Sequence, residues 1–200
     1  IYTLSLHDAL PIYELKIMVK LDALSEYSSG KAALAKIRNS IGKPVNEVTE
    51  VWQLLFENLP EEFLGSRGTP SDEELSILTA IQLYALHKQG TSSKGNVEES
   101  KGFKNLGYSL GKLRIADGQT SIDRRFNSMI TSTTFDELIH HLRHLIKILK
   151  AKMPDVSVDY AKLAEDLFGY LKGYEAEIRL KWAREYYRQN NKGEDNHEQE

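Results

Sequence analysis

The stretch "SDEELSILTAIQLYALHKQG", residues 71–90, decides the fold. Ser71 is followed three residues later by Glu74, the spacing of a capping box, in which each side chain bonds the backbone amide of the other residue. The segment after the cap is apolar on nearly every face, which is typical of a buried helix. We therefore predict that this helix is the centre of a bundle and ends at Gly90. His87 is interpreted as a histidine that interacts with the helix dipole rather than as a ligand.

The segments on both sides of this helix also have helical patterns. Apolar side chains recur at steps of three and four residues, the period of an amphipathic helix. In the first segment, Ser28 or Ser29 is the expected N-cap. In the last segment, the predicted buried stripe includes Tyr174 and Trp182, and Gly169 and Gly173 predict a kink or break. The segments with this pattern are 28–44, 48–60, 106–114, 121–130, 138–152 and 159–188.

These patterns predict an all-α protein of two packed, bundle-like helical subdomains. The polar, Gly- and Ser-rich stretch 91–107 is the expected linker. It divides an N-terminal helical subdomain, 13–95, from a C-terminal helical bundle with a basic face, 96–189. Residues 190–200 are polar and acidic and are predicted to be a disordered tail. No run of apolar residues approaches the roughly 20 that a membrane span needs, and the chain has no cysteine, so we expect a cytoplasmic protein without disulfides or thiolate metal sites.

The first residues, "IYTLSLHDALPI" (1–12), match neither the helical nor the strand period, unlike the segments that follow. One codon choice for this stretch resembles a widely used short-read sequencing adapter, so we interpret it as a translated adapter and exclude it from fold reasoning. His7 and Asp8 interrupt its apolar run, and no basic segment precedes that run, so it does not resemble a signal peptide. We expect residues 1–12 to make few contacts with the core.

Positive charge is concentrated in one part of the chain. The net charge of the whole chain is −3, but residues 101–152 carry ten basic and four acidic side chains. A local basic zone in a mildly acidic protein indicates a surface that faces a polyanion, although solvated helix faces produce the same count. The pattern of a sequence-reading recognition helix is missing, so we expect contacts to a nucleic-acid backbone. The candidate nucleic-acid-binding residues are Lys31, Arg38, Lys43, Lys112, Arg114, Arg124, Arg125, Arg143 and Lys147.

Tyrosines in the last helical segment offer a second kind of nucleic-acid contact. Their rings could stack on bases. At helical spacing beside leucine and tryptophan, however, tyrosines more often belong to a core or an interface. The tyrosines in question are at positions 160, 170, 174, 186 and 187.

Catalytic features are weak in this sequence. Asp136, His140 and His144 are spaced by four and would share one helix face that could bind a divalent metal. No second cluster of histidines and acids completes such a site, and Asp136 suits the first turn of its helix. No phosphate-binding loop or nucleophile elbow is present. We therefore expect no enzyme activity, no metal and no cofactor, and we regard a metal-dependent phosphohydrolase as the weakest alternative.

The order of motifs along residues 30–190 resembles the CasB family, the small subunit of the type I-E CRISPR Cascade complex. The resemblance is carried by the following stretches: "KAALAKIRNSIGKP", "WQLLF", "IQLYALHKQG", "YSLGKLR", "IDRRFNSMI", "HHLRHLIKILK", "DYAKLAEDLFGYL" and "IRLKWAREYYR". It implies a two-part, all-α, non-catalytic subunit. Members of the family sit as two copies in the complex, beside its backbone-forming and large subunits.

The resemblance also implies a site. Family members help to hold the CRISPR RNA–target DNA hybrid and the displaced non-target DNA strand through basic surfaces. The positions that match are Arg38, Lys112, Arg124, Arg125 and Arg143, whereas Lys31, Lys43, Arg114 and Lys147 come from helix geometry alone. The alternative is a stand-alone helical protein that binds nucleic acid or another partner.

Overall fold

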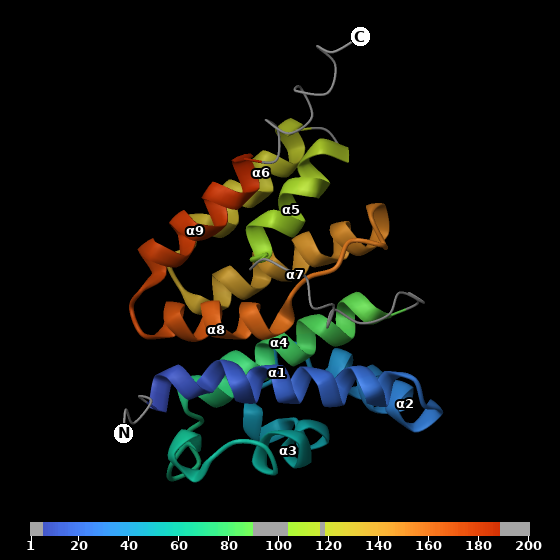
Figure 1. Ribbon diagram of the computed structural model, residues 1–200, viewed down its shortest axis with the longest axis vertical. Coiled ribbons are helices and arrows are strands. Elements are labelled where there is room, and N and C mark those ends of the chain that lie inside the picture. Colours follow the sequence, from blue (N-terminus) through green and yellow to red (C-terminus); the bar gives the residue numbers. More distant parts are fainter. Residues whose placement is uncertain (1–5, 90–103, 117–118, 189–200) are drawn as a thin grey trace.

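The computed structural model describes residues 6–89, 104–116 and 119–188, and this part of the chain is all-α, as predicted (Figure 1). Its elements are α1 (Leu6–Ser25), α2 (Ser28–Asn39), η1 (Val45–Glu47), α3 (Thr49–Phe56), η2 (Glu61–Phe63), α4 (Asp72–Lys88), α5 (Leu106–Ala116), α6 (Gln119–Ile130), α7 (Phe135–Lys152), α8 (Tyr160–Leu171) and α9 (Glu175–Arg188). The molecule is elongated, with α1, α2 and α3 at one end and α5, α6 and α9 at the other.

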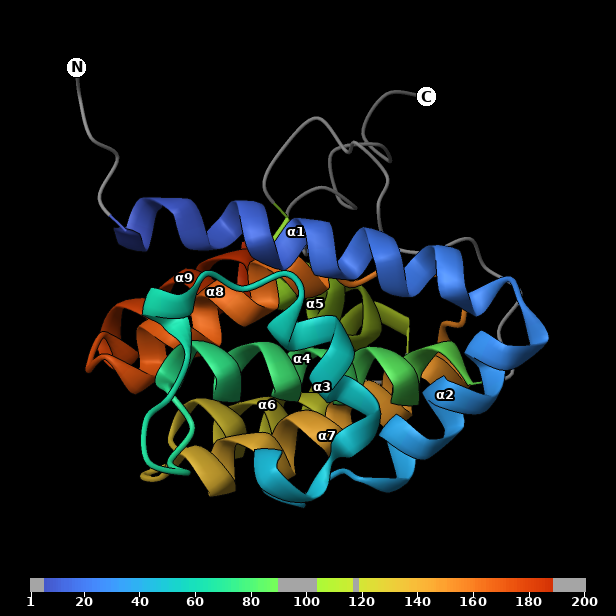
Figure 2. The ribbon, with the colours of Figure 1, turned by 90° about the horizontal axis from the view of Figure 1, so that it is seen from below.

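The helix α4 is the centre of the molecule, as its sequence predicts. Its side chains are buried from Ser76 to His87. The capping box is confirmed, because the Glu74 amide donates to Ser71 Oγ over 3.0 Å and the Ser71 amide donates to Glu74 Oε2 over 2.8 Å. Figure 2 shows α4 between α1 and α7, with α3 in front of it. Every face of α4 therefore meets another helix.

Packing against α4 joins the two halves of the molecule. On one side α4 contacts α1 and α2, and on the other it contacts α7 and α8, while α1 also packs on α8. The buried apolar side chains of all these helices form one continuous cluster. The predicted boundary at residues 95–96 and the predicted tail at 190–200 lie outside the described residues.

The helices α5 and α9 cross with their backbones in contact. Gly107 lies at the crossing, and a Cβ atom there would overlap the carbonyl oxygen of Trp182. The two backbones can approach this closely because Gly107 has no side chain. The Trp182 indole is fully buried, and its Nε1 donates a hydrogen bond of 2.7 Å to the buried carboxylate of Asp166 on α8.

The last helical segment divides at Gly173, one of the two glycines predicted to break it, whereas Gly169 lies inside the continuous helix α8. One residue of the predicted buried stripe is also wrong. Gly173 has a φ of +89°, a conformation that side chains other than glycine rarely adopt, and α9 starts two residues later. Because of this turn, the residues after Gly173 do not continue the helical period of α8. Ile178 and Trp182 remain buried, but Tyr174 falls in the turn and is 57 % exposed.

Two predictions about helix ends are also wrong. The N-cap of α2 is Tyr27, which forms no side-chain cap, so neither Ser28 nor Ser29 has that role. His87 is buried near the end of α4, with its ring 6.0 Å from that of Tyr160. Burial, helped by Lys88 and Lys150, lowers the pKa of His87 to about 4. The ring is therefore neutral at pH 7 and does not bring a positive charge to the helix dipole.

The helix α1 was not predicted. It begins at Leu6, so residues 6–12 continue the helix of the segment that follows them. Among residues 1–12 the structure describes the exposure of Pro11 alone, and this proline is half-buried. The expectation that residues 1–12 make few core contacts remains a prediction. Among the described helices, none combines the length and the apolar character that a bilayer crossing requires.

Candidate nucleic-acid interface

The helix α6 presents two adjacent arginines to solvent. Its apolar residues Ile122, Phe126 and Met129 recur at steps of four and three and are buried. Arg124 and Arg125 fall between them in the sequence, so they point away from the core and are exposed. The guanidinium groups are therefore available for bidentate contacts to phosphate.

The helix α7 runs beside α6 and carries a second set of basic side chains. Its start is capped by Thr134, whose side chain accepts a hydrogen bond from the Glu137 amide. The predicted apolar stripe, which includes Leu138, Leu142 and Leu149, is buried. Outside this stripe, His140, His144 and Lys147 are exposed, as are the acidic residues Asp136 and Glu137 in the first turn.

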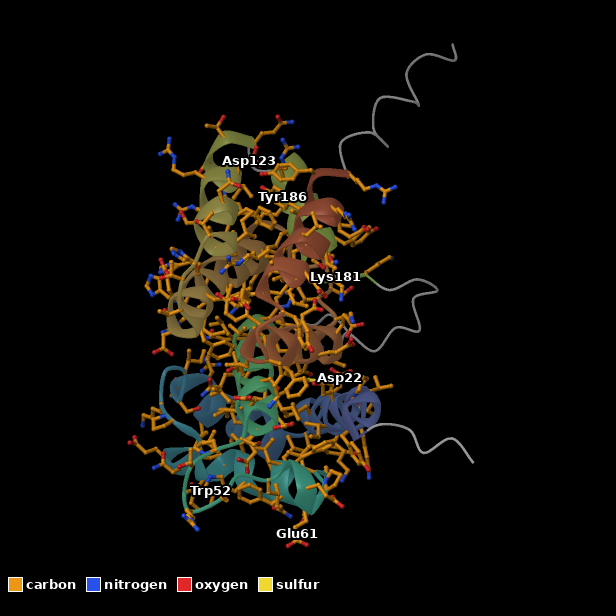
Figure 3. The ribbon with its side chains drawn as sticks, turned by 90° about the vertical axis from the view of Figure 1, so that its left-hand side faces the viewer. Asp22, Trp52, Glu61, Asp123, Lys181 and Tyr186 are labelled. Carbon is orange, nitrogen blue, oxygen red and sulfur yellow. The ribbon has the colours of Figure 1, made fainter. Side chains whose placement is uncertain are left out.

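A groove lies between these two helices. Its volume is about 480 Å³, and its lining residues are Thr120, Ser121, Arg124, Arg125, Ser128 and His141. Figure 3 views the molecule from the side and shows the nitrogen-tipped side chains along one edge, beside α6 and α7. We call this surface the α6–α7 basic face and define it by six residues: Arg124, Arg125, His140, His141, His144 and Lys147.

The histidines of this face lie close together. The ring centroids of His140 and His144 are 4.7 Å apart, and those of His140 and His141 are 5.5 Å apart. Burial lowers the pKa of His144, and the nearby His140, Lys147, Arg125 and His141 lower it further. A group whose protonation is opposed by neighbouring positive charge lies in a positive local potential. The face therefore favours an anionic ligand.

Arg38 of α2 extends the basic region beyond α7. Lys150, near the end of α7, donates hydrogen bonds to the Leu86 carbonyl oxygen over 3.2 Å and to Gln89 Oε1 over 3.0 Å. Burial lowers the pKa of Lys150, and the charge of Arg38 lowers it further, so the two cations are neighbours. Residues far apart in the sequence thus meet here because α4 holds α2 and α7 together.

The remaining predicted residues take three different positions. Lys31 and Lys43 are exposed, Lys31 in the first turn of α2 and Lys43 just beyond its end. Arg143 is half-buried, and its Nε has no hydrogen-bond partner among the described residues. Lys112 lies on α5, where its Nζ is 5.1 Å from the ring centroid of Tyr108. No contact in the described part of the chain places Lys112 beside the α6–α7 basic face.

Arg114 has an intramolecular partner. Its Nε and Nη2 donate to the two carboxylate oxygens of Asp123 over 2.7 and 3.2 Å, and only 11 % of its side chain is exposed. Its guanidinium also lies over the rings of Tyr186 and Tyr187. The hydrogen bond to Asp123 raises the pKa of Arg114. Helix spacing alone did not show this partner, and we leave Arg114 out of the proposed surface.

The possible metal-binding face of Asp136, His140 and His144 gains no further ligand from the part of the chain that the structure describes. In residues 6–89, 104–116 and 119–188, no group of three histidine, aspartate or glutamate side chains is arranged to hold a metal ion. His141 instead lies 3.9 Å from Glu137, whose carboxylate accepts a hydrogen bond of 2.7 Å from the Thr133 amide at the helix start. The acidic end of α7 thus serves to cap the helix.

Sequence reasoning missed the small polar residues of the groove. Thr120, Ser121 and Ser128 line it with the two arginines of α6. The hydroxyl groups of Thr120 and Ser121 can donate to phosphate oxygens, whereas Ser128 Oγ already donates to the Arg124 carbonyl oxygen over 3.1 Å. A signal was present, because positions 121, 124, 125 and 128 share one face of a helix, and all four carry polar side chains.

Comparisons with known proteins agree with this fold. The family profile of the CRISPR-associated protein Cse2 matches residues 33–187. The structure of M. ruber CasB aligns with a TM-score of 0.67 at 23 % identity, covering 98 % of this chain and 99 % of that one. CasB from Thermobifida fusca aligns with a TM-score of 0.64 at 20 % identity, covering 90 % and 96 %. A chain of a CRISPR RNA-guided surveillance complex aligns with a TM-score of 0.66 at 16 % identity, covering 90 % and 94 %. A sequence search of curated proteins finds no match.

Proposed function

Because the chain belongs to the CRISPR-associated Cse2 family, we propose that it is the non-catalytic small subunit of a type I-E CRISPR Cascade complex in the cytoplasm. In this role it stabilises the guide RNA–target DNA hybrid and the displaced strand. Opening a duplex on a guide RNA exchanges one set of base pairs for another at nearly equal free energy. Protein contacts to the nucleic-acid backbone can therefore shift the equilibrium toward the open duplex. Such contacts need positive charge on a rigid surface and no catalytic group.

The observation that carries this proposal is the α6–α7 basic face. Arg124 and Arg125 are exposed beside a groove lined with hydroxyl groups. Arg38 and Lys150 continue the positive region toward α2. Basic side chains on three helices can follow a phosphate backbone without reading the bases. Lys31, Lys43, Arg143, Lys147 and Lys112 are proposed as further backbone contacts.

The proposed partners follow from the same assignment. They are CRISPR RNA, both DNA strands, a second copy of this chain, and the backbone-forming and large subunits of the complex. The likeness to a chain of an RNA-guided surveillance complex supports this assembly. Co-purification of the chain with a guide RNA and these subunits would distinguish it from a stand-alone nucleic-acid-binding protein.

Charge reversal tests the site. We expect a complex reconstituted with the Arg124→Glu, Arg125→Glu subunit to form less R-loop on target DNA than the complex with the unchanged subunit, as measured by gel shift and by chemical probing of unpaired bases. The matched control is Lys181→Glu, Arg184→Glu, which reverses two exposed charges on α9. Equal R-loop formation by the two double variants would refute the assignment, provided that both unfold at the same temperature as the unchanged subunit.

A further inference from the structure

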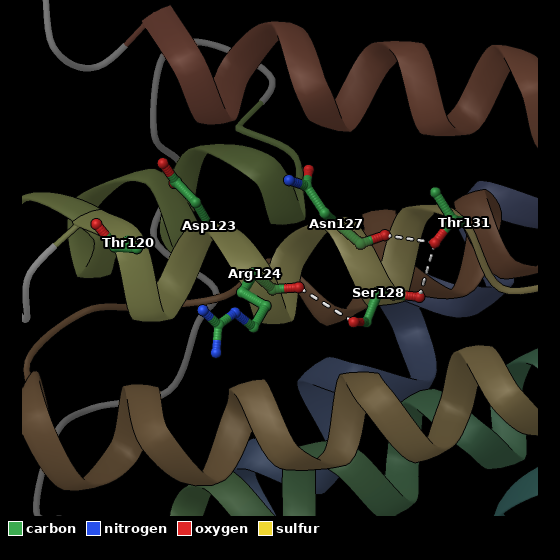
Figure 4. A pocket seen from close by; sticks show the side chains of 6 residues that line it. All are labelled: Thr120, Asp123, Arg124, Asn127, Ser128 and Thr131. Atoms are coloured by element: carbon green, nitrogen blue, oxygen red, sulfur yellow. Dashed lines mark hydrogen bonds between the residues drawn. The ribbon is translucent and has the colours of Figure 1, made fainter.

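A second groove follows the outer side of α6. Its volume is about 520 Å³, and its lining residues are Thr120, Asp123, Arg124, Asn127, Ser128 and Thr131. Figure 4 shows Asp123 and Asn127 on the side of α6 toward α9, and Arg124 and Ser128 on the side toward α7. We call it the α6 outer groove.

A partly exposed aromatic ring borders this groove. Tyr187 on α9 is 41 % exposed, and its hydroxyl donates a hydrogen bond of 3.1 Å to Asn127 Oδ1. Other rings fix its position, because Phe126 and Tyr186 stack with centroids 3.7 Å apart and both meet the Tyr187 ring edge to face. Tyr187 is thus the solvent-facing member of an ordered aromatic cluster.

The polar groups of the groove complement a heterocyclic base. The hydrogen bond from Tyr187 orients the Asn127 amide, whose nitrogen remains a donor. The Thr131 hydroxyl donates a hydrogen bond of 2.7 Å to the backbone carbonyl oxygen of Asn127, so the hydroxyl oxygen can still accept a hydrogen bond. Asp123 offers a further acceptor, and its negative charge disfavours a phosphate inside the groove. Arg124, on the opposite edge, can take that phosphate.

We propose that Tyr187 and the α6 outer groove bind one unstacked base of a single-stranded nucleic acid. Arg114 lies over part of the Tyr187 ring, 5.4 Å from its centroid, and the part that stays exposed provides the stacking surface. Asn127 contacts the edge of the base, and Arg124 contacts the adjoining phosphate. This inference rests on the proposed nucleic-acid-binding function and deepens it, because it names the form of nucleic acid that the surface holds. A base inside a duplex cannot reach the ring.

The experiment compares two fluorescent probes on the full-length chain by anisotropy. One is a single-stranded 12-mer with normal bases, and the other is a 12-mer of the same length and charge with abasic sites. We expect the unchanged protein to bind the base-bearing probe more tightly. Tyr187→Leu should lose about 5- to 150-fold of affinity for that probe only, the usual range for one stacked base. Arg124→Glu should weaken both probes.

Two further variants separate stacking from a structural role. Tyr187→Phe keeps the ring but loses the hydrogen bond that orients Asn127, so it should lose clearly less affinity for the base-bearing probe than Tyr187→Leu. If the Tyr187 hydroxyl served only to hold α9 against α6, Tyr187→Phe would lower the affinity for the base-bearing probe as much as Tyr187→Leu. Tyr174→Leu changes an exposed tyrosine before the start of α9 and should have no effect. Each variant is first checked for an unchanged unfolding temperature.

The outcomes distinguish this inference from the proposed function. Equal affinity of the unchanged protein for both probes overturns the base site and leaves backbone binding intact. A Tyr187→Leu variant that retains the preference for bases also overturns it. Binding of neither probe overturns the site and the proposed function together.

Discussion

Arg114 on α5 and Asp123 on α6 form an ion pair with two hydrogen bonds, of 2.7 and 3.2 Å. The hydroxyl of Tyr186 on α9 donates to the same Asp123 Oδ1 over 2.7 Å, and Figure 3 shows Asp123 and Tyr186 side by side. One carboxylate therefore joins three helices at one end of the molecule. An arginine that looked like a phosphate ligand from its spacing instead stabilises the fold.

We predict that Asp123→Asn lowers the free energy of unfolding at pH 7 by roughly 1.5–3 kcal/mol, the range for hydrogen bonds to charged groups. Burial opposes ionisation of Asp123, but the hydrogen bonds from Arg114 and Tyr186 outweigh it, and its pKa is lowered from 3.8. Its contribution is therefore complete above pH 3.8 and is lost as the pH falls through the lowered pKa. Urea unfolding at pH 7 and pH 3 measures both effects, and equal stability of the two proteins at pH 7 would contradict the prediction.

Salt dependence can count the phosphate contacts of the α6–α7 basic face. Each contact to single-stranded nucleic acid contributes about 0.7 to the slope of log affinity against log salt, and each contact to duplex DNA about 0.9. Removing Arg125 by substitution with Ala should reduce the slope by one such step. Binding titrations at several salt concentrations test this. Arg114→Ala is the control, and a slope equally reduced in that variant would show that the effect is not specific to the face.

We predict that nucleic-acid binding strengthens as the pH falls below about 6.5. Burial, His140, Lys147, Arg125 and His141 lower the pKa of His144, so its ring is neutral at pH 7. A bound phosphate would offset the surrounding positive charge and raise that pKa, adding about tenfold to the affinity at low pH for each unit of change.

The measurement is affinity at pH 7.5 and pH 5.5. The variant His144→Gln should flatten the pH dependence, whereas His197→Gln, in the C-terminal segment, should leave it unchanged. A pH profile that is identical in His144→Gln and the unchanged protein would exclude His144 as its source.

The α5–α9 crossing should not tolerate a side chain. Gly107→Ala would place a methyl group against the backbone of Trp182, which cannot move without separating the helices. We expect a loss of about 1–3 kcal/mol of stability, typical of overpacking. Thermal unfolding measures it. Lys181→Ala, at an exposed neighbour of Trp182, should have little effect, and a stable Gly107→Ala protein would show that the crossing can open.

A buried acid on α1 should make the protein less stable as the pH rises. Glu14 is fully buried, both of its carboxylate oxygens have no hydrogen-bond partner among the described residues, and it faces α8. Burial, and then the charge of Glu165, raise the pKa of Glu14 well above 4.5. Because the folded state holds this proton more tightly, stability falls as the pH rises above 4.5 toward the raised pKa.

We therefore expect Glu14→Gln to raise the unfolding free energy at pH 8 by about 1.4 kcal/mol for each unit by which burial raises the pKa of Glu14, because glutamine does not ionise. The gain should disappear near pH 4, where the glutamate of the unchanged protein is protonated in both states. Chemical denaturation at the two pH values tests this. A variant that is less stable than the unchanged protein at pH 8 would mean that the carboxylate has a favourable partner.

The sequence predicted best where the helical period is strong. The buried residues of α7 and the exposure of Arg124 and Arg125 follow directly from steps of three and four. The same rule failed for Tyr174, because Gly173 starts a new period.

The helical period could not predict contacts between residues on different helices. The partner of Arg114 lies on another helix, and Arg38 meets Lys150 only because both of their helices pack on α4. Burial of His87 depends on Tyr160, which is distant in the sequence. Local spacing shows which face a residue shares, but it does not show what packs against that face.

The burial of α4 on every side has a mechanical consequence. Because α4 contacts α1 and α2 on one side and α7 and α8 on the other, Arg38 on α2 and the arginines of α6 belong to one packed unit. In the proposed function, a strand that reaches all of these cations must follow the path that their spacing sets, and one with a different rise or curvature loses contacts at one end.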